Sequence, residues 1–386
     1  MAETLIEAVE SILPTAGSIG VLLPGLVRRL AEADVRSVVV TGDADPPALD
    51  RARVVGPGAL DGDLGGVDGC SIIHVHGVSD VGGVGDVSGV IAVGDVSDVG
   101  RRAVKLGERL GVPVVLSPLG ALDSAAFERM SWWQRRRSRA RLRAALDRVQ
   151  HLAAINDHEL GDLRAWSPRS SSSVLEYGID FDEYANLPAD RVRLDKAVDR
   201  QVMLVMGPIH PVEGLVPLLY AFGGLIHELA GWHLVLAGPE TADWRMQLES
   251  TIRRKGGEAR VTFVSDPDLD DQRSLLARAS LVVVPALQVR PPTTILQAVA
   301  AEVPVIASDR VVPNALRDFI ATCPPARGPL ADALRRFLQQ TAEQRSASAR
   351  RAREMGRRAY DWSILAPTYV DRYRAVAAGG SSTVHT

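Results

Sequence analysis

Residues 281–309 read LVVVPALQVRPPTTILQAVAAEVPVIASD. The apolar run from Leu281 to Val284 predicts a buried strand. We expect a helix to begin near Pro291 or Pro292, since proline suits the first helical turn. A second apolar strand follows from Val303 to Ala307. A strand, loop, helix and strand in this order place free backbone N–H groups at the mouth of a parallel sheet, where anions commonly bind. The stretch therefore predicts an α/β fold with an anion site at the start of the helix.

The composition of the chain excludes several classes of protein. Its 386 residues are enough for two domains. A net charge of −3 does not suit a nucleic-acid-binding protein. Cys70 and Cys323 are far apart in the sequence, so no disulfide framework or zinc site is indicated, and we expect no metal and no cofactor. The chain has no apolar run of about 18 residues and no signal peptide, which predicts a cytoplasmic protein.

Strands alternate with helices in both halves of the chain. In the first half we expect strands at 37–41, 71–75, 113–117 and 174–177, and helices at 19–31 and 101–110. In the second half we expect further strands at 203–206, 234–237 and 261–264. Regular alternation of this kind implies parallel sheets with right-handed crossovers.

The domain boundaries follow from the same pattern. A polar, charged stretch at 186–200 predicts a linker between an N-terminal domain at 1–185 and a C-terminal domain at 201–361. We expect a helix at 362–378 to cross back and pack on the first domain, and a disordered tail at 379–386.

Two shorter segments stand out in the first half. Residues 77–100 form a Gly-, Asp-, Val- and Ser-rich tract whose glycines favour a loop. Asn156 and Glu159 have the spacing of a capping box, which predicts a helix start there and a structural role for Glu159.

Six short motifs resemble, in order and spacing, those of family 4 glycosyltransferases. They are PTAGSIG at 14–20, HVHG at 74–77, SPLGALD at 117–123, LEYGID at 175–180, GPIHPVEGL at 207–215 and LAGP at 236–239. The resemblance covers nearly the whole chain. It implies a GT-B arrangement, in which two Rossmann-like domains enclose a ligand cleft. It also implies a nucleotide-diphosphate sugar as the donor ligand and a glycan or lipid-linked acceptor.

Five positions depart from the family pattern. Leu119 replaces a histidine that faces the donor sugar in the family. Pro208 and Glu213 replace an arginine and a lysine that contact the donor diphosphate. Val289 replaces the glutamate that lies behind the transferred sugar in the family, and Gln297 replaces the glutamate that binds the nucleotide ribose. Losing two charge-assisted phosphate contacts costs about 3–6 kcal/mol, which is on the order of 10²–10⁴ in affinity.

Other residues near these positions still suit an anion or a nucleotide. Such residues offer backbone N–H groups, hydroxyls, an amide or a cation. The candidates are Gly17, Ser18 and Gly20 in the first glycine loop, Gly207 and His210 in the second loop, and Arg290, Thr293, Thr294 and Gln297 around the predicted helix start. The alternative is that these residues have structural roles only. Arg290 would then be a solvated charge on the loop, and Thr294 would cap the helix.

Residues 131–146 read SWWQRRRSRARLRAAL and predict a basic helix that begins with two tryptophans. The residues expected to form its membrane or partner surface are Trp132, Trp133, Arg135, Arg136, Arg137 and Arg139. Three hypotheses remain open for this segment. They are attachment to the inner face of an anionic membrane, docking to an acidic partner protein, and a solvated surface helix.

Three functional hypotheses follow. The first is a glycosyltransferase-like protein of glycan or polysaccharide biosynthesis with a degenerate donor site, weakly active or non-catalytic, acting as a binding or partner subunit. The second is an active retaining glycosyltransferase with a donor site rebuilt around Arg290, His210 and the helix start. The third is a sugar-nucleotide enzyme of another kind, such as an epimerase, for which no acid–base set is present.

Overall fold

The computed structural model of the chain describes residues 3–9, 11–14, 18–61, 70–76, 98–123, 132–133, 136, 146–168, 170–188 and 191–379. The Gly- and Asp-rich tract at 77–97, most of the basic helix at 131–146 and the tail at 380–386 lie outside these residues.

The first sheet has seven strands in the order β3-β2-β1-β4-β5-β6-β7, all of them parallel. The strands are β1 (Glu3–Val9), β2 (Val35–Thr41), β3 (Ala52–Val55), β4 (Cys70–His76), β5 (Val114–Ser117), β6 (His151–Ala154) and β7 (Ser171–Val174). The described helices beside them are α1 (Leu23–Glu32), α2 (Asp98–Leu110) and α5 (Asp157–Trp166).

The second sheet has six strands in the order β10-β9-β8-β11-β12-β13, also all parallel. The strands are β8 (Gln201–Met206), β9 (Trp232–Gly238), β10 (Val261–Ser265), β11 (Ala279–Val284), β12 (Val305–Ser308) and β13 (Ala321–Cys323). The helices that follow them are α6 (Leu215–Gly224), α7 (Ala242–Arg254), α8 (Leu269–Arg278), α9 (Thr293–Ala300), α10 (Arg327–Leu338) and α11 (Ala342–Tyr360).

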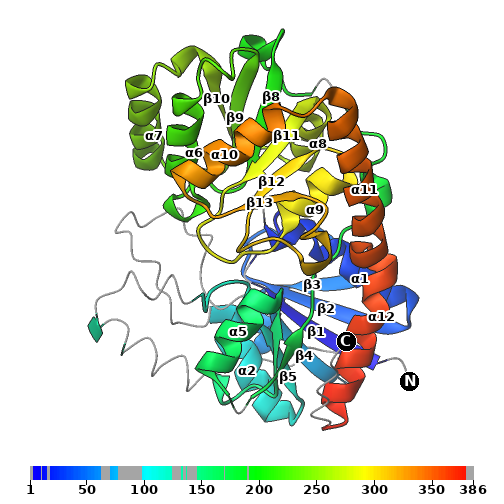
Figure 1. The fold of residues 1–386 in the computed structure, drawn as a ribbon. Helices are drawn as coiled ribbons and strands as arrows, with labels where there is room; N and C mark the ends of the chain where they lie inside the picture. Colours follow the sequence, from blue (N-terminus) through cyan, green and yellow to red (C-terminus); the bar gives the residue numbers. More distant parts are fainter. Residues whose placement is uncertain are drawn as a thin grey trace.

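The two sheets form two layered domains, one above the other in Figure 1. The last helix, α12 (Trp362–Ala377), continues from α11 along one side of the molecule and packs against α1 of the first domain. Trp362 fixes this crossing, since its side chain is fully buried and its Nε1 donates to the carbonyl of Leu22. Gly25 makes the close approach possible, because a Cβ there would lie 2.3 Å from the Trp362 ring.

One apolar cluster continues from the first domain into the second. It contains Leu5 and Leu26 from the first domain, Met206 and Val289 from the second, and Trp362 from α12. Burying each such side chain contributes about 1.5–3 kcal/mol relative to leaving it exposed. The two domains therefore share a core.

The predicted α/β fold with two parallel sheets is confirmed. The strand expected at 174–177 is wrong in position, because β7 covers Ser171–Val174 instead. A serine-rich run forms this edge strand, in which the hydroxyls of Ser171 and Ser173 both hydrogen-bond to His151 on β6. Strands β1, β3, β6 and β13 were not predicted.

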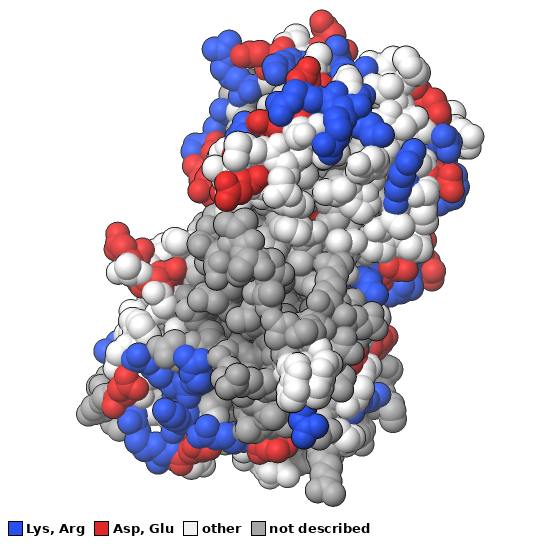
Figure 2. Space-filling view, turned by 90° about the vertical axis from the view of Figure 1, so that its left-hand side faces the viewer, with Lys and Arg blue, Asp and Glu red and all other residues white. Residues whose placement is uncertain are grey.

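Charged side chains are spread over both domains. On the face drawn in Figure 2, basic and acidic residues lie among one another at both ends of the molecule. A nucleic-acid-binding protein would show a continuous basic stripe, and the described surface of this face has none. Among the helices that the structure describes, none is long and apolar enough to cross a bilayer.

Candidate functional site

The predicted helix start lies where the strand order of the second sheet reverses. Strands β8 and β11 are neighbours at the centre of that sheet, and the chain continues from them toward opposite edges. Ligands of open α/β sheets bind beyond the carboxyl ends of the strands at such a point. The loop 207–214 follows β8, and the loop 285–292 follows β11 and leads into α9. The candidate donor-site residues of the second domain lie on these two loops and on α9.

Arg290 and Glu213 form an ion pair between the two loops. Their side chains are only 13% and 12% exposed. Arg290 also covers Gly207, where an added Cβ would lie 3.0 Å from a guanidinium nitrogen. Burial lowers the pKa of Arg290 to about 10, so the guanidinium stays charged at neutral pH. The cation that the sequence offers for a phosphate is therefore neutralised by a carboxylate of its own chain.

His210 precedes the short 3-10 helix η5 (Pro211–Glu213) and caps it. Its Nδ1 accepts a hydrogen bond from the N–H of Val212. Burial lowers the pKa of His210 below its usual value. The imidazole is therefore neutral at pH 7 and adds no positive charge to the loop.

The two threonines at the start of α9 are buried and donate to backbone carbonyls. The Thr293 hydroxyl lies 3.2 Å from the carbonyl oxygen of Ser18 in the first domain. The Thr294 hydroxyl lies 3.0 Å from the carbonyl oxygen of Met206 at the end of β8. These hydroxyls thus hold the helix start against both domains, while the first N–H groups of α9 have no acceptor within the helix.

Gln297 is fully buried one turn further along α9. Its Nε2 donates to the Tyr184 hydroxyl and to Oε1 of Gln272, each at 3.2 Å. Its own Oε1 is buried and has no hydrogen-bond partner. Among the described candidate residues, Gln297 therefore has a buried side-chain atom without a hydrogen-bond partner, and an acceptor of this kind suits a hydroxyl donor.

Val289 packs directly against the SPLGALD loop of the first domain. Its N–H donates to Oδ2 of Asp123 at 2.7 Å. Gly120 has a φ of +88°, and a Cβ there would lie 1.8 Å from the carbonyl oxygen of Val289. Leu119 is half-buried with a φ of +56°, a conformation that costs a leucine roughly 1–2 kcal/mol. The two loops are in contact at the position where the family pattern carries its sugar-facing residues.

The described part of the first glycine loop is held both by contacts within its own domain and by Thr293 of the second domain. The Ser18 hydroxyl donates to the carbonyl of Leu13 at 3.0 Å. Gly20 lies against the backbone, since a Cβ there would be 2.3 Å from the Leu13 oxygen. Gly17 lies outside the described residues. At Gly20, the close packing of the chain already explains why the residue is a glycine.

Pro208 offers no hydrogen-bond donor at its family position, since proline lacks both a side-chain donor and an N–H. The next residue, Ile209, donates its N–H to the carbonyl of Pro239 at 2.8 Å. This bond pins the loop 207–214 to the chain that follows β9.

Sequence reasoning missed two charged residues at the domain boundary. Asp123 has a fully buried side chain, and Nη1 of Arg310 lies 3.3 Å from its Oδ1. The carbonyl of Arg310 accepts from Nδ2 of Asn156 at 3.3 Å. Asp123 is part of a quoted motif, but nothing in the pattern marks it as a residue that contacts the second domain.

The predicted capping box is present in part. The Asn156 side chain accepts from the N–H of Glu159 at 2.9 Å, as predicted. The Glu159 carboxylate accepts instead from the N–H groups of Gly120 at 2.6 Å and Ile155 at 2.8 Å. Burial raises the pKa of Glu159 to about 7. Glu159 therefore holds the SPLGALD loop through the N–H of Gly120.

The comparisons with known proteins cover the second domain by sequence and the whole chain by structure. Residues 200–340 match the family model for group 1 glycosyl transferases. No curated protein sequence matches the chain significantly.

Three solved structures illustrate the structural similarity. Sucrose-phosphate synthase from Thermosynechococcus elongatus has a TM-score of 0.74 at 17% identity, covering 98% of this chain and 100% of that chain. HepE of Anabaena in complex with UDP and glucose has a TM-score of 0.70 at 15% identity, covering 97% and 100%. A UDP-forming trehalose-phosphate synthase from Burkholderia xenovorans has a TM-score of 0.67 at 13% identity, covering 98% and 100%. Residues 200–340 are thus similar to group 1 glycosyl transferases, and the chain as a whole has the two-domain GT-B fold.

Proposed function

We propose that this chain is a glycosyltransferase-like protein of family 4 type that serves glycan or polysaccharide biosynthesis without productive donor binding, as a binding or partner subunit. The observation that carries the proposal is the buried ion pair between Glu213 and Arg290. A donor diphosphate needs cations that are free to pair with it. The cation at this position is already paired with a carboxylate, and that carboxylate repels a phosphate.

The neighbouring residues support the same proposal. The hydroxyls of Thr293 and Thr294 donate to backbone carbonyls, and the N–H of Val289 donates to Asp123. Pro208 and Leu119 add no polar side chain. What remains for a nucleotide is the unused acceptor of Gln297 and the first N–H groups of α9.

A titration with nucleotide sugars tests this function. We expect calorimetry with UDP-, GDP- and ADP-glucose to show no binding at micromolar concentrations, because two charge-assisted phosphate contacts are worth about 10²–10⁴ in affinity. UDP-glucose is the first choice, since a solved HepE structure holds that ligand. Micromolar binding of any of the three would overturn the proposal and favour an active retaining transferase, in which Arg290→Ala should then abolish binding.

We also propose that the tryptophan pair of the basic segment contacts an anionic membrane. Trp132 and Trp133 are 60% and 67% exposed, and their ring centroids lie 3.8 Å apart. Arg136 is exposed as well, whereas Arg135, Arg137 and Arg139 lie outside the described residues. Paired exposed indoles beside arginines suit the interface of a bilayer that carries negative charge.

Vesicle sedimentation tests the membrane contact. Withdrawing part of two tryptophans from water contributes about 2–4 kcal/mol at roughly 25 cal/mol per Å². We therefore expect Trp132→Ser with Trp133→Ser to weaken binding to phosphatidylglycerol-containing vesicles at least about tenfold. The matched control replaces Met246 on α7 and Ile364 on α12 with serine. These side chains are 59% and 54% exposed, and this variant should bind the vesicles as the unaltered protein does. Equal binding of all three proteins would contradict the membrane proposal.

A further inference from the structure

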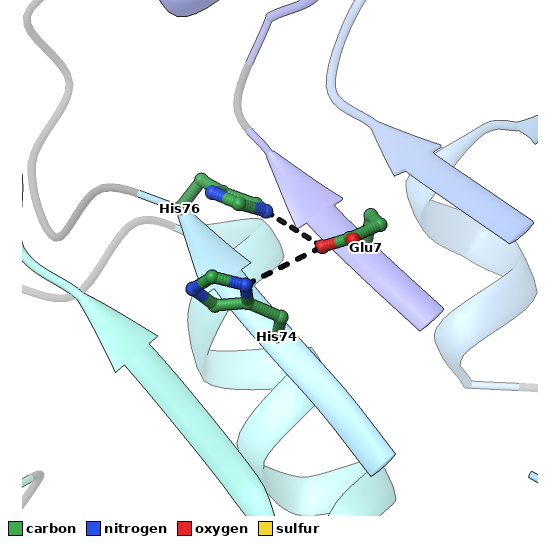
Figure 3. A group of neighbouring side chains, drawn as sticks. All are labelled: Glu7, His74 and His76. Carbon is green, nitrogen blue, oxygen red and sulfur yellow. Dashed lines mark hydrogen bonds and ion pairs between the residues drawn. The ribbon is translucent and has the colours of Figure 1, made fainter. Parts of the chain in front are cut away.

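Three titratable side chains meet inside the first domain. Glu7 lies on β1, and its register partner on β4 is His74. His76 is two residues further along β4, so it lies on the same face of the sheet. All three side chains are buried and point toward one another (Figure 3). The face they share is covered by α12, which contributes the hydroxyl of Tyr373.

The ligand atoms of this group converge on one point. Oε2 of Glu7 lies 2.6 Å from Nε2 of His76 and 3.6 Å from Nδ1 of His74. The Tyr373 hydroxyl lies 2.7 Å from Nδ1 of His74 and 3.4 Å from Oε1 of Glu7. A tetrahedral zinc ion with bonds of about 2.0–2.1 Å holds neighbouring ligand atoms roughly 3.3 Å apart. The observed separations lie on both sides of that value, so small shifts would fit the ion.

Each histidine has a hydrogen-bond partner for the ring nitrogen that faces away from the group. Nε2 of His74 lies 2.8 Å from the Ser117 hydroxyl, and Nδ1 of His76 lies 2.5 Å from the Tyr177 hydroxyl. Metal-binding histidines almost always use the second nitrogen in this way, which fixes the ring and its tautomer. The arrangement therefore directs one nitrogen of each ring toward Glu7.

The buried carboxylate of Glu7 also suits a bound cation. Its carboxylate is fully buried, and its ion pairs with described residues are with the two histidines. A buried carboxylate needs a cation or strong donors to offset its lost hydration. A second group of similar composition, with Asp123 and His158, already has Arg310 within 3.5 Å of both. No described lysine or arginine forms an ion pair with Glu7.

We propose that Glu7, His74 and His76, with the Tyr373 hydroxyl at the fourth corner, form a closed structural site for a divalent zinc-class metal ion. The ion would link the central strands β1 and β4 to α12, the helix that crosses over from the second domain. Imidazole and carboxylate ligands in a tetrahedral, solvent-free setting favour zinc over magnesium or calcium. The spacing of the two cysteines, from which the sequence predicts no metal, gives no sign of such a site. Its ligands are two histidines on one strand and a glutamate on another.

Metal analysis of the purified full chain is the first test. The site is buried, so the ion must enter during folding, and the protein is produced in zinc-supplemented medium. We expect about one zinc ion per chain after dialysis and a lower melting temperature after removal with a chelator during refolding. Glu7→Gln should lose the zinc. The proposal is overturned if the protein is metal-free and refolding with zinc chloride neither loads it nor raises its melting temperature.

Two further variants separate metal binding from a metal-free hydrogen-bond network. Tyr177→Phe removes the outer partner of His76 and should weaken zinc affinity about 10–100-fold in a competitive chelator titration. His151→Gln is the matched control, because His151 is also buried, on β6 of the same sheet, and its side-chain hydrogen bonds among the described residues are to Ser171 and Ser173. It should keep its zinc. Refolding the unaltered chain with cobalt should give the visible absorption of tetrahedral cobalt, and an octahedral spectrum would count against the site.

Discussion

Replacing Glu213 with glutamine is expected to lower the free energy of unfolding by about 3 kcal/mol. The substitution leaves the Arg290 charge buried without its carboxylate, and breaking a buried pair on one side costs roughly 3–5 kcal/mol. The lower figure applies because the two side chains keep 13% and 12% of their exposure. Urea denaturation of the unaltered protein and the variant measures the difference.

The matched control removes both charges. Glu213→Gln combined with Arg290→Gln leaves no unpaired ion, and such double replacements are often close to neutral. We therefore expect the double variant to unfold within about 1 kcal/mol of the unaltered protein. Arg290→Gln alone completes the set. If the losses of the two single variants add up in the double variant, the side chains contribute independently, and their ion pair is not what keeps Arg290 from a phosphate.

The architecture could be predicted from the sequence because it depends on local patterns. The apolar runs at 281–284 and 303–307 lie within β11 (Ala279–Val284) and largely within β12 (Val305–Ser308), with α9 between them. Weaker patterns failed. The strand β1 reads ETLIEAV, and its buried Glu7 and Thr4 hide the apolar run that marks a central strand.

The site could be predicted only in part, because its chemistry depends on pairs that are distant in the sequence. From the sequence, Glu213 is predicted to be a substituted family position and Arg290 an anion-binding candidate, with no link between the two. Their spacing in the chain gives no sign that they meet. The same holds for Asp123, which reaches the N–H of Val289 across the domain boundary. Spatial pairing of this kind is set by the fold, and a single sequence does not contain it.

Pro208→Arg combined with Glu213→Gln is expected to create nucleotide-sugar binding. The first substitution returns a cation to the loop after β8, and the second frees Arg290 from its carboxylate. Two charge-assisted phosphate contacts contribute about 3–6 kcal/mol, so the affinity for a donor such as UDP-glucose should rise on the order of 10²–10⁴-fold. Isothermal calorimetry against the unaltered protein measures this gain.

Adding Arg290→Gln to this variant is the control that locates the effect. It removes one of the two cations and should give back about 1.5–3 kcal/mol, which is roughly one to two decades of affinity. If the folded double variant still fails to bind, charge is not what closes the site, and the contact between Val289 and the SPLGALD loop becomes the obstacle to test.

Ligand rescue links the binding result to the stability result. Glu213→Gln weakens the fold because a guanidinium is left unpaired, and a bound diphosphate would pair it again. A ligand at about 100 times its dissociation constant stabilises the folded state by roughly 2.7 kcal/mol. UDP-glucose should therefore restore most of the lost stability in the Pro208→Arg, Glu213→Gln protein and much less in the same protein carrying Arg290→Gln. Rescue that depends on Arg290 would show that a bound diphosphate can replace the Glu213 carboxylate as the partner of this guanidinium.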